Sequence, residues 1–240
     1  PYVMPKEKPT FKMSCAMNRV YDNYGAATPQ LNELYTNFKY SPLTGFDYHN
    51  DDGTVTRRDP SRIIKVNGKY YMWYTKRCTP TTFVGTKLAN DTIPSVDWDL
   101  CDIAYATSKD GFHWTTPSTI QLKYPSDRLR SWHLDVIHTE KGYEMLVVAF
   151  CKGHRHREMN LYYTSSKNEH DFKKCITILK PSEKEKAWDN RGIYRSSFFV
   201  ENGIYYIYYS GIGYPKGPNS SQGVGLTYGP SVKNIHGYDA

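Results

Sequence analysis

Long apolar runs are missing from this sequence. Its mean hydropathy is −0.68 and 23% of its 240 residues are charged, and no stretch approaches the roughly 18 consecutive apolar residues of a membrane-spanning helix. We therefore expect no membrane partner. The chain opens at Pro1 without a charged and apolar leader, so a secretory signal either has been removed or was never present, and the compartment stays undecided.

Paired cysteines and metal-binding spacings are also missing. The five cysteines are widely spaced and form no Cys-x-x-Cys motif, which excludes zinc ribbons and redox motifs. Cys78 and Cys101, at the ends of one long loop, either form a disulfide or are free thiols. His154 and His156 are close in sequence, but Glu158 is the one acidic residue near them, so we expect no metal and no other cofactor.

A concentrated basic surface is absent although the net charge is +7. The densest basic stretch, residues 152–157, lies between two apolar runs and is typical of a solvated loop. No pattern of a recognition helix accompanies it, so a nucleic-acid partner is not expected.

What the sequence does contain is a repeated hairpin pattern, in which two β-rich runs flank a turn glycine. Asn-Gly between such runs is a strong hairpin signal, because a type I′ turn needs positive φ at both central residues. A further strand signature follows each hairpin, at residues 103–114, 160–172 and 223–235. The hairpins span residues 59–75, 134–150 and 194–210, with turn glycines Gly68, Gly142 and Gly203.

Sheets of four strands that repeat around an axis form a β-propeller. We predict an all-β fold in which Tyr70–Tyr74, Met145–Ala149 and Tyr205–Tyr209 are the second strands of three separate sheets. Since a closed ring needs about four blades or more, either residues 1–57 and the C-terminus supply further strands or the propeller is incomplete.

The sequence divides into an N-terminal segment, residues 1–57, and a propeller domain, residues 58–240. The segment contains one predicted short helix at 28–38, with Thr28 as N-cap and Pro29 at the first helical position. Its apolar face can dock on its own propeller or on a second subunit, as the arm of a homodimer.

Two blocks of sequence resemble glycoside hydrolase family 117: Arg57–Ser61, which reads RRDPS, with the hairpin after it, and residues 102–114. The resemblance covers roughly residues 30–115. It implies a five-bladed propeller that releases 3,6-anhydro-L-galactose from the non-reducing end of neoagarooligosaccharides. Residues 131–137 and 194–197 look more like family 43-related propeller proteins.

Glycoside hydrolysis generally needs an acid and a base, about 6.5 to 9.5 Å apart in inverting enzymes. Asp59 begins an innermost strand and precedes a proline, so it is the predicted general base, with a turn-capping role as the alternative. Arg58 beside it is expected to contact substrate.

Positions in the next blades can be aligned on the turn glycines. His133 and Tyr194 each precede their turn glycine by nine residues, as Asp59 does. The resemblance implies a histidine as general acid, from a later blade, and His133 is the catalytic candidate at the matching depth. Asp135 is a second candidate carboxylate, which either tunes the acid or holds the sugar, or else pairs with Arg130 or Arg195.

The third blade supplies further substrate-binding candidates. Tyr194 holds the matching position, and Arg195 can clamp a hydroxyl or carboxylate or form an ion pair with Asp189, itself a binding candidate. Trp132 can stack on a sugar face.

The sequence therefore predicts an exo-acting, inverting glycosidase with an oligosaccharide substrate. Two alternatives remain: a non-catalytic carbohydrate-binding propeller, and a glycoside phosphorylase in which His154, Arg155 and Arg157 would bind phosphate.

Overall fold

The computed structural model describes most of the chain after Asp52. The predicted helix at 28–38, most of the segment 1–57 and the basic stretch 152–157 lie outside the described residues. Those described are 2–3, 8, 10, 18, 39–40, 43–45, 52–115, 118–127, 129–151, 159–172, 174–213 and 222–237.

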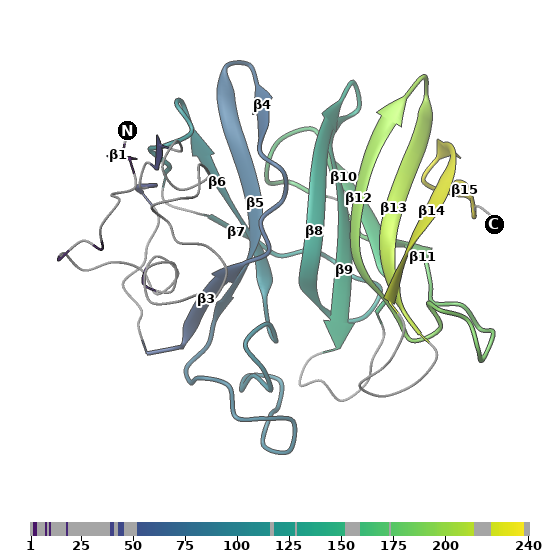
Figure 1. The fold of residues 1–240 in the computed structure, drawn as a ribbon, viewed down its shortest axis with the longest axis horizontal. Coiled ribbons are helices and arrows are strands. Elements are labelled where there is room, and N and C mark those ends of the chain that lie inside the picture. Colours follow the sequence, from purple (N-terminus) through teal and green to yellow (C-terminus); the bar gives the residue numbers. More distant parts are fainter. Residues whose placement is uncertain are drawn as a thin grey trace.

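The described fold is all-β, and three antiparallel sheets form its body (Figure 1). A separate two-stranded pair joins β1 (Tyr2–Val3) and β2 (Lys39–Tyr40). The first sheet contains β3 (Val55–Arg58), β4 (Ile64–Val66), β5 (Lys69–Cys78), β6 (Asp102–Ser108) and β7 (Ser118–Ile120); the second contains β8 (Leu129–Thr139), β9 (Gly142–Cys151), β10 (Leu161–Ser166) and β11 (Ile176–Leu179); the third contains β12 (Gly192–Glu201), β13 (Ile204–Ile212), β14 (Gln222–Ser231) and β15 (Asn234–Gly237).

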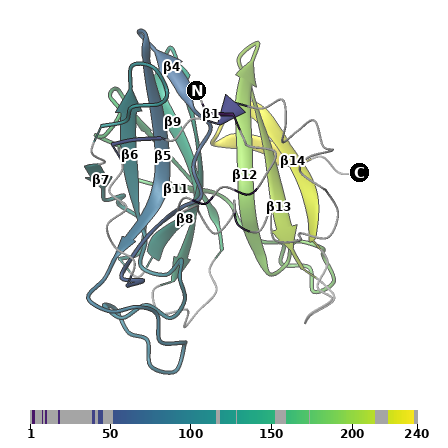
Figure 2. The ribbon, with the colours of Figure 1, turned by 60° about the vertical axis from the view of Figure 1, so that its left-hand side comes forward.

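Each sheet is built like a propeller blade, because its strands pair in sequence order from one edge to the other, except that β3 and β4 of the first sheet both pair with β5. The predicted second strands lie in β5, β9 and β13 of three different sheets, which confirms the hairpin prediction. The first strand of the second sheet, β8, contacts β4 and β5 of the first sheet and β12, the first strand of the third sheet. Figure 1 shows the three sheets side by side, and in Figure 2 the third sheet stands apart from the other two, which overlap in that view.

The turn residues explain why the hairpins form where they do. Asn67 and Gly68 have φ of 50° and 78°, and Asn202 and Gly203 have φ of 50° and 77°, as a type I′ turn requires. Gly142 is needed for a second reason, since a Cβ atom there would lie 2.3 Å from a backbone oxygen of the neighbouring strand.

The core lies between the sheets. One cluster joins the first and second sheets around Trp73, which is fully buried, and a second joins the second and third sheets around Phe198. Between the latter sheets, buried Glu144 accepts hydrogen bonds from the hydroxyls of Tyr163 and Tyr205 at 2.5 and 2.7 Å. The blades are thus joined by apolar packing and by a satisfied buried carboxylate.

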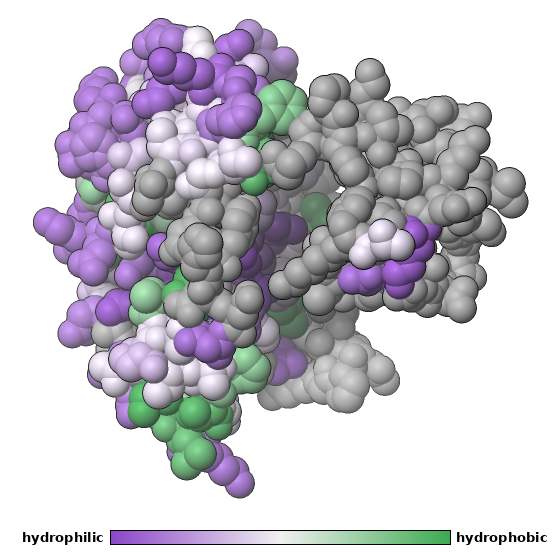
Figure 3. All heavy atoms as spheres, turned by 90° about the vertical axis from the view of Figure 1, so that its left-hand side faces the viewer, coloured by the Kyte–Doolittle hydropathy of each residue, from purple (hydrophilic) through white to green (hydrophobic). Residues whose placement is uncertain are grey.

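The long loop after β5 is held by one buried side chain. The guanidinium of Arg77, which is fully buried, donates to the backbone oxygens of Gly53 and Asp97. At its far end, Phe83 and Leu88 are 51% and 71% exposed, and Figure 3 shows a hydrophobic patch at the lower end of the molecule. No helix of the described residues is both long and apolar enough to span a membrane.

Of the two alternatives left open for Cys78 and Cys101, the structure has the free thiols and no disulfide. Both thiols are free, with Cys78 exposed and Cys101 buried. Burial raises the pKa of Cys101 to about 12, and the positive charges of Arg77 and Arg58 only partly oppose this shift. The long loop is therefore held by Arg77 and not by a covalent bond.

We expect this difference in burial to set thiol reactivity. A thiol-alkylating reagent at neutral pH should modify Cys78 quickly and leave Cys101 unmodified in the folded protein, because the thiolate is the reactive form. Peptide mass spectrometry after labelling measures both sites. Equal labelling of both thiols in the folded protein would contradict the prediction, and labelling in urea provides the control for peptide recovery.

Candidate functional site

The first strand of each sheet is irregular at the same depth. In the first sheet, Asp59 lies in the break between β3 and β4 and has a φ of 52°. In β8 the register with β9 shifts at Trp132 and His133, and in β12 the register with β13 shifts at Tyr194. Such irregularities redirect side chains and concentrate near active sites. Here they bring together the three residues that precede each turn glycine by nine positions.

Asp59 lies against His133, with 3.4 Å between Oδ1 and Nδ1. Its Oδ2 accepts a hydrogen bond from Nε of Arg58 at 3.1 Å and one from the Thr75 hydroxyl at 3.4 Å. These partners are side chains and not turn amides, so the capping alternative for Asp59 finds no support. Positive φ in a residue other than glycine is uncommon and clusters at functional sites.

His133 is buried and held between aromatic rings. Its ring centroid lies 4.5 Å from that of Trp132 and 5.0 Å from that of Tyr194. Both ring nitrogens are buried without a hydrogen-bond partner among the described residues, and the contact with Asp59 lacks the geometry of a hydrogen bond. An unsatisfied buried polar group requires an explanation, and a ligand hydroxyl would satisfy this one.

The surroundings of Asp59 change its acidity in opposing ways. Burial raises the pKa of its carboxyl group, but the interactions with His133 and the positive charge of Arg58 outweigh burial and hold the pKa below the ordinary 3.8. Asp59 is therefore ionised at neutral pH. Its ionised form stabilises the fold above pH 3.8, and this contribution is lost as the pH falls through the folded-state pKa.

We expect a carboxyl-detected NMR titration of Asp59 to give a midpoint below 3.8. His133→Asn should raise this midpoint, since it removes the interactions with His133 that lower the pKa of Asp59 while leaving Arg58 in place. A midpoint above 4, or one that His133→Asn leaves unchanged, would contradict this account of the pair.

Asp135 has a different environment. Its carboxylate accepts two hydrogen bonds from Arg62, at 2.9 and 2.5 Å, and others from the Ser197 hydroxyl and the amide of Phe198, both at 3.2 Å. The amide of Val136 completes the set. The predicted ion pair thus exists, but its partner is Arg62. The network joins the first, second and third sheets.

Arg130 and Arg195, the two partners expected from the sequence, are placed elsewhere. Arg130 donates to backbone oxygens of Asp127 and Leu129, whereas Arg195 is exposed. Asp189 accepts from the hydroxyl of Tyr209 at 3.2 Å. The alternative ion pair between Arg195 and Asp189 is not formed among the described residues.

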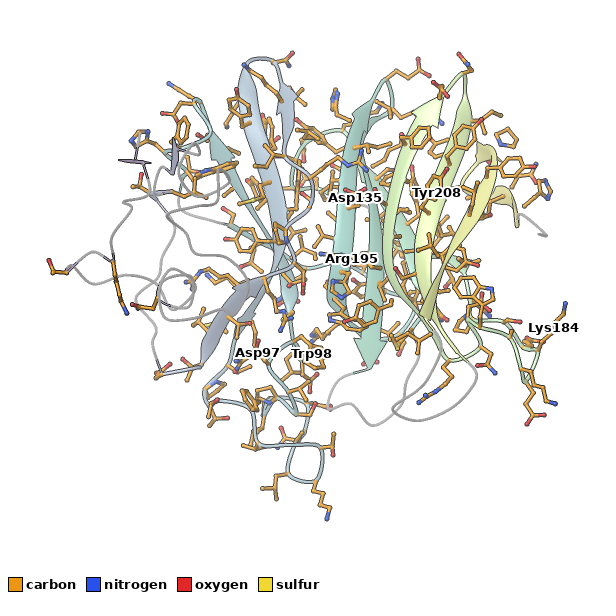
Figure 4. The ribbon with its side chains drawn as sticks, viewed as in Figure 1. Asp97, Trp98, Asp135, Lys184, Arg195 and Tyr208 are labelled. Atoms are coloured by element: carbon orange, nitrogen blue, oxygen red, sulfur yellow. The ribbon has the colours of Figure 1, made fainter. Side chains whose placement is uncertain are left out.

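A cavity of about 510 Å³ lies next to these groups. Figure 4 shows Asp135, Arg195 and Tyr208 on the neighbouring strands β8, β12 and β13. Its lining includes Pro60, Arg62, Asp135, Arg195, Ser196 and Tyr208. The volume is within the range of sites for small ligands.

Sequence reasoning did not single out several residues near Asp59. Arg62 follows the RRDPS block directly, but nothing in the sequence identifies its partner. Asp97 accepts from Nη1 of Arg58 at 2.8 Å, and the Trp98 ring lies 5.4 Å from the Arg58 guanidinium. These two residues come from the long loop, where no strand periodicity could align them with Asp59.

The described residues include no group of three or more His, Cys, Asp or Glu side chains that could hold a metal ion. His154 and His156 lie outside the described residues.

Comparison with solved structures identifies the class of fold. The family 117 glycoside hydrolase Zg3597 of the marine bacterium Zobellia galactanivorans is 31% identical, with a TM-score of 0.71 over 84% of this chain and 60% of that one. An α-L-arabinofuranosidase of Lactobacillus brevis matches at 13% identity and a TM-score of 0.56, over 80% of this chain and 58% of that one. A comparison with protein-family models and one with curated proteins found no match.

The fold is that of the propeller glycoside hydrolases. Within this class the chain is related to family 117, which confirms the resemblance seen in the sequence. The structural match covers 84% of the chain. The similarity to family 117 therefore extends beyond residues 30–115, where the sequence first indicated it. The chain spans 60% of the length of this relative, and three blades lie within its described residues.

Proposed function

We propose that the protein is a glycoside hydrolase in which Asp59 is the general base. The observation that carries this proposal is the convergence of Asp59, His133 and Tyr194 at irregular positions of three first strands. An ionised carboxylate beside an aromatic-lined site has the chemistry needed to activate water against a sugar ring.

The geometry supports a specific division of roles. His133 lies 3.4 Å from Asp59, whereas the acid and base of an inverting glycosidase are about 6.5 to 9.5 Å apart. We therefore assign His133 to orient and charge-stabilise Asp59, and the proton for the leaving oxygen comes from a separate group on the far side of the sugar. Asp135 is assigned to hold Arg62 and the blades, since its oxygens are occupied.

Among the remaining candidates, Trp132, Tyr194 and Arg195 are proposed to bind substrate, and Arg58 and Asp189 are proposed to position other side chains. Trp132 and Tyr194 pack edge-on with centroids 4.6 Å apart, and Tyr194, at 36% exposed, offers its ring to a sugar face. Arg58 lies against Asp59 and Asp97 and positions these carboxylates. Arg195 reaches the neighbouring cavity, and Asp189 holds Tyr209 beside it.

The relationship to family 117 supports a proposal for the substrate and the stereochemistry. We propose that the enzyme releases 3,6-anhydro-L-galactose, or a related sugar, from the non-reducing end of neoagarooligosaccharides with inversion. Incubation with neoagarobiose, with arabinan and xylan oligosaccharides in parallel, tests the substrate, and proton NMR of the first-formed anomer tests inversion. Binding without turnover of any of these sugars would favour the non-catalytic carbohydrate-binding alternative.

The N-terminal segment is proposed as a dimerisation arm, on the apolar face predicted for residues 28–38. Removal of residues 1–40 should then convert a dimer to a monomer in sedimentation velocity, because the arm supplies the contact. The control is circular dichroism, which should show the same β-sheet signal for both proteins. A full-length monomer would show that the segment docks on its own propeller.

A further inference from the structure

The cavity beside the proposed catalytic pair has one cationic group in excess. Its lining contains two arginines, Arg62 and Arg195, and one carboxylate, Asp135. Arg62 is bound to Asp135 through two hydrogen bonds, so their charges compensate each other. Arg195 is exposed and has no carboxylate partner among the described residues. The cavity therefore offers a free guanidinium to a ligand.

A second feature of the cavity is an unsatisfied hydroxyl. Ser196 is 8% exposed, and its Oγ is buried with no hydrogen-bond partner among the described residues. It lines the cavity beside Arg195. A buried polar group without a partner is costly, and a rotation of this side chain toward the cavity would let a bound ligand supply the missing hydrogen bond.

The cavity also contains apolar surface suited to a ring. Tyr208 is 43% exposed and Val224 is 75% exposed, and both line the cavity. Sugar faces carry C–H groups that pack on such surfaces while their hydroxyls form hydrogen bonds. Ser197 and Ser210 place further hydroxyls in the same lining.

We infer that this cavity is a subsite for a sugar bearing an anionic substituent, a carboxylate or a sulfate, which binds Arg195. This inference rests on the proposed function, because the subsite adjoins Asp59 through Pro60. The planar guanidinium fork matches the two oxygens of such groups. Ser196 and Ser197 bind sugar hydroxyls, and Tyr208 contacts the ring.

Inorganic phosphate has the same oxyanion chemistry, and a phosphorylase would need it. It fits the cavity less well, for two reasons. One uncompensated guanidinium supplies little of the charge that a free dianion requires, and a phosphate ion leaves the exposed rings and Val224 without contacts. A sugar acid uses both features of the lining.

The test is a binding measurement that needs no turnover. D-galacturonic acid, galactose 6-sulfate, galactose and inorganic phosphate are titrated into the full chain at fixed ionic strength, with NMR detection of the amides in β12. We expect the two anionic sugars to bind about tenfold more tightly than galactose, as for a charge-assisted hydrogen-bond pair. Phosphate should bind more weakly than either.

Arg195→Gln should abolish this preference, so that the anionic sugars bind no more tightly than galactose, and Arg195→Lys should retain part of it. Lys233→Gln, at an exposed position in the turn between β14 and β15, is the control for net charge and should behave as the unchanged protein. Equal binding of galactose and the acids overturns the inference, as does phosphate binding as tight as theirs. Failure of Asp59→Asn to lose activity would contradict the proposed function alone, because binding is measured without chemistry.

Discussion

Asp59→Asn is expected to lower turnover of the substrate by ~10² to 10⁴-fold, the usual range for losing a general base. The amide has nearly the same size but cannot take a proton from water. Asparagine is the appropriate replacement because it also tolerates the positive φ of 52° at this position, which alanine would not. Substrate affinity should change little.

Stability separates this interpretation from a structural one. Asp59 contacts His133, Arg58 and Thr75, so the variant should lose some stability together with its turnover. A destabilised but fully active Asp59→Asn would contradict the catalytic role. The matched control is Asp91→Asn at an exposed loop position, for which both turnover and melting temperature should be unchanged.

The positions of the blades and of the central site could be predicted from the sequence because each depends on local chemistry. Asn-Gly turns fix the position at which a hairpin reverses direction. Counting residues along the strand then gives the distance of each residue from the turn. Counting nine residues from the turn glycine identified Asp59, His133 and Tyr194, and the structure brings these three together.

The partners of these residues could not be predicted in the same way. Counting residues along a strand gives the depth of a side chain within its own sheet. It does not show which side chain from another sheet contacts it. Arg62 reaches Asp135 over 73 positions of sequence, from the interrupted region after Asp59 that follows no strand periodicity. The bulges in β8 and β12 also change which face a residue occupies, so Asp135 meets Arg62 and not the arginines on its own or the next first strand.

We expect the Arg62–Asp135 pair to contribute strongly to the stability of the fold. Asp135→Asn should lower the free energy of unfolding by about 3 kcal/mol, toward the lower end for a broken buried ion pair, because the Arg62 side chain is partly exposed. Arg62→Gln should cost a similar amount, since it leaves the buried carboxylate with fewer donors. Urea unfolding of each variant gives these values.

A double-mutant cycle shows whether the two effects are one interaction. If the pair joins the blades as proposed, Asp135→Asn and Arg62→Gln together should cost much less than the two single changes added, with a coupling of about 1 to 3 kcal/mol. Asp127→Asn, at an exposed position before β8, is the matched control and should leave stability unchanged. The alternative is that Asp135 takes part in the reaction, and turnover by the folded fraction tests it. If Asp135 is a structural carboxylate, Asp135→Asn should turn over substrate at a near-normal rate. A loss as large as that of Asp59→Asn would instead show that Asp135 takes part in the reaction. The asparagine in the variant can still accept hydrogen bonds from Ser197 and Phe198, but it carries no charge.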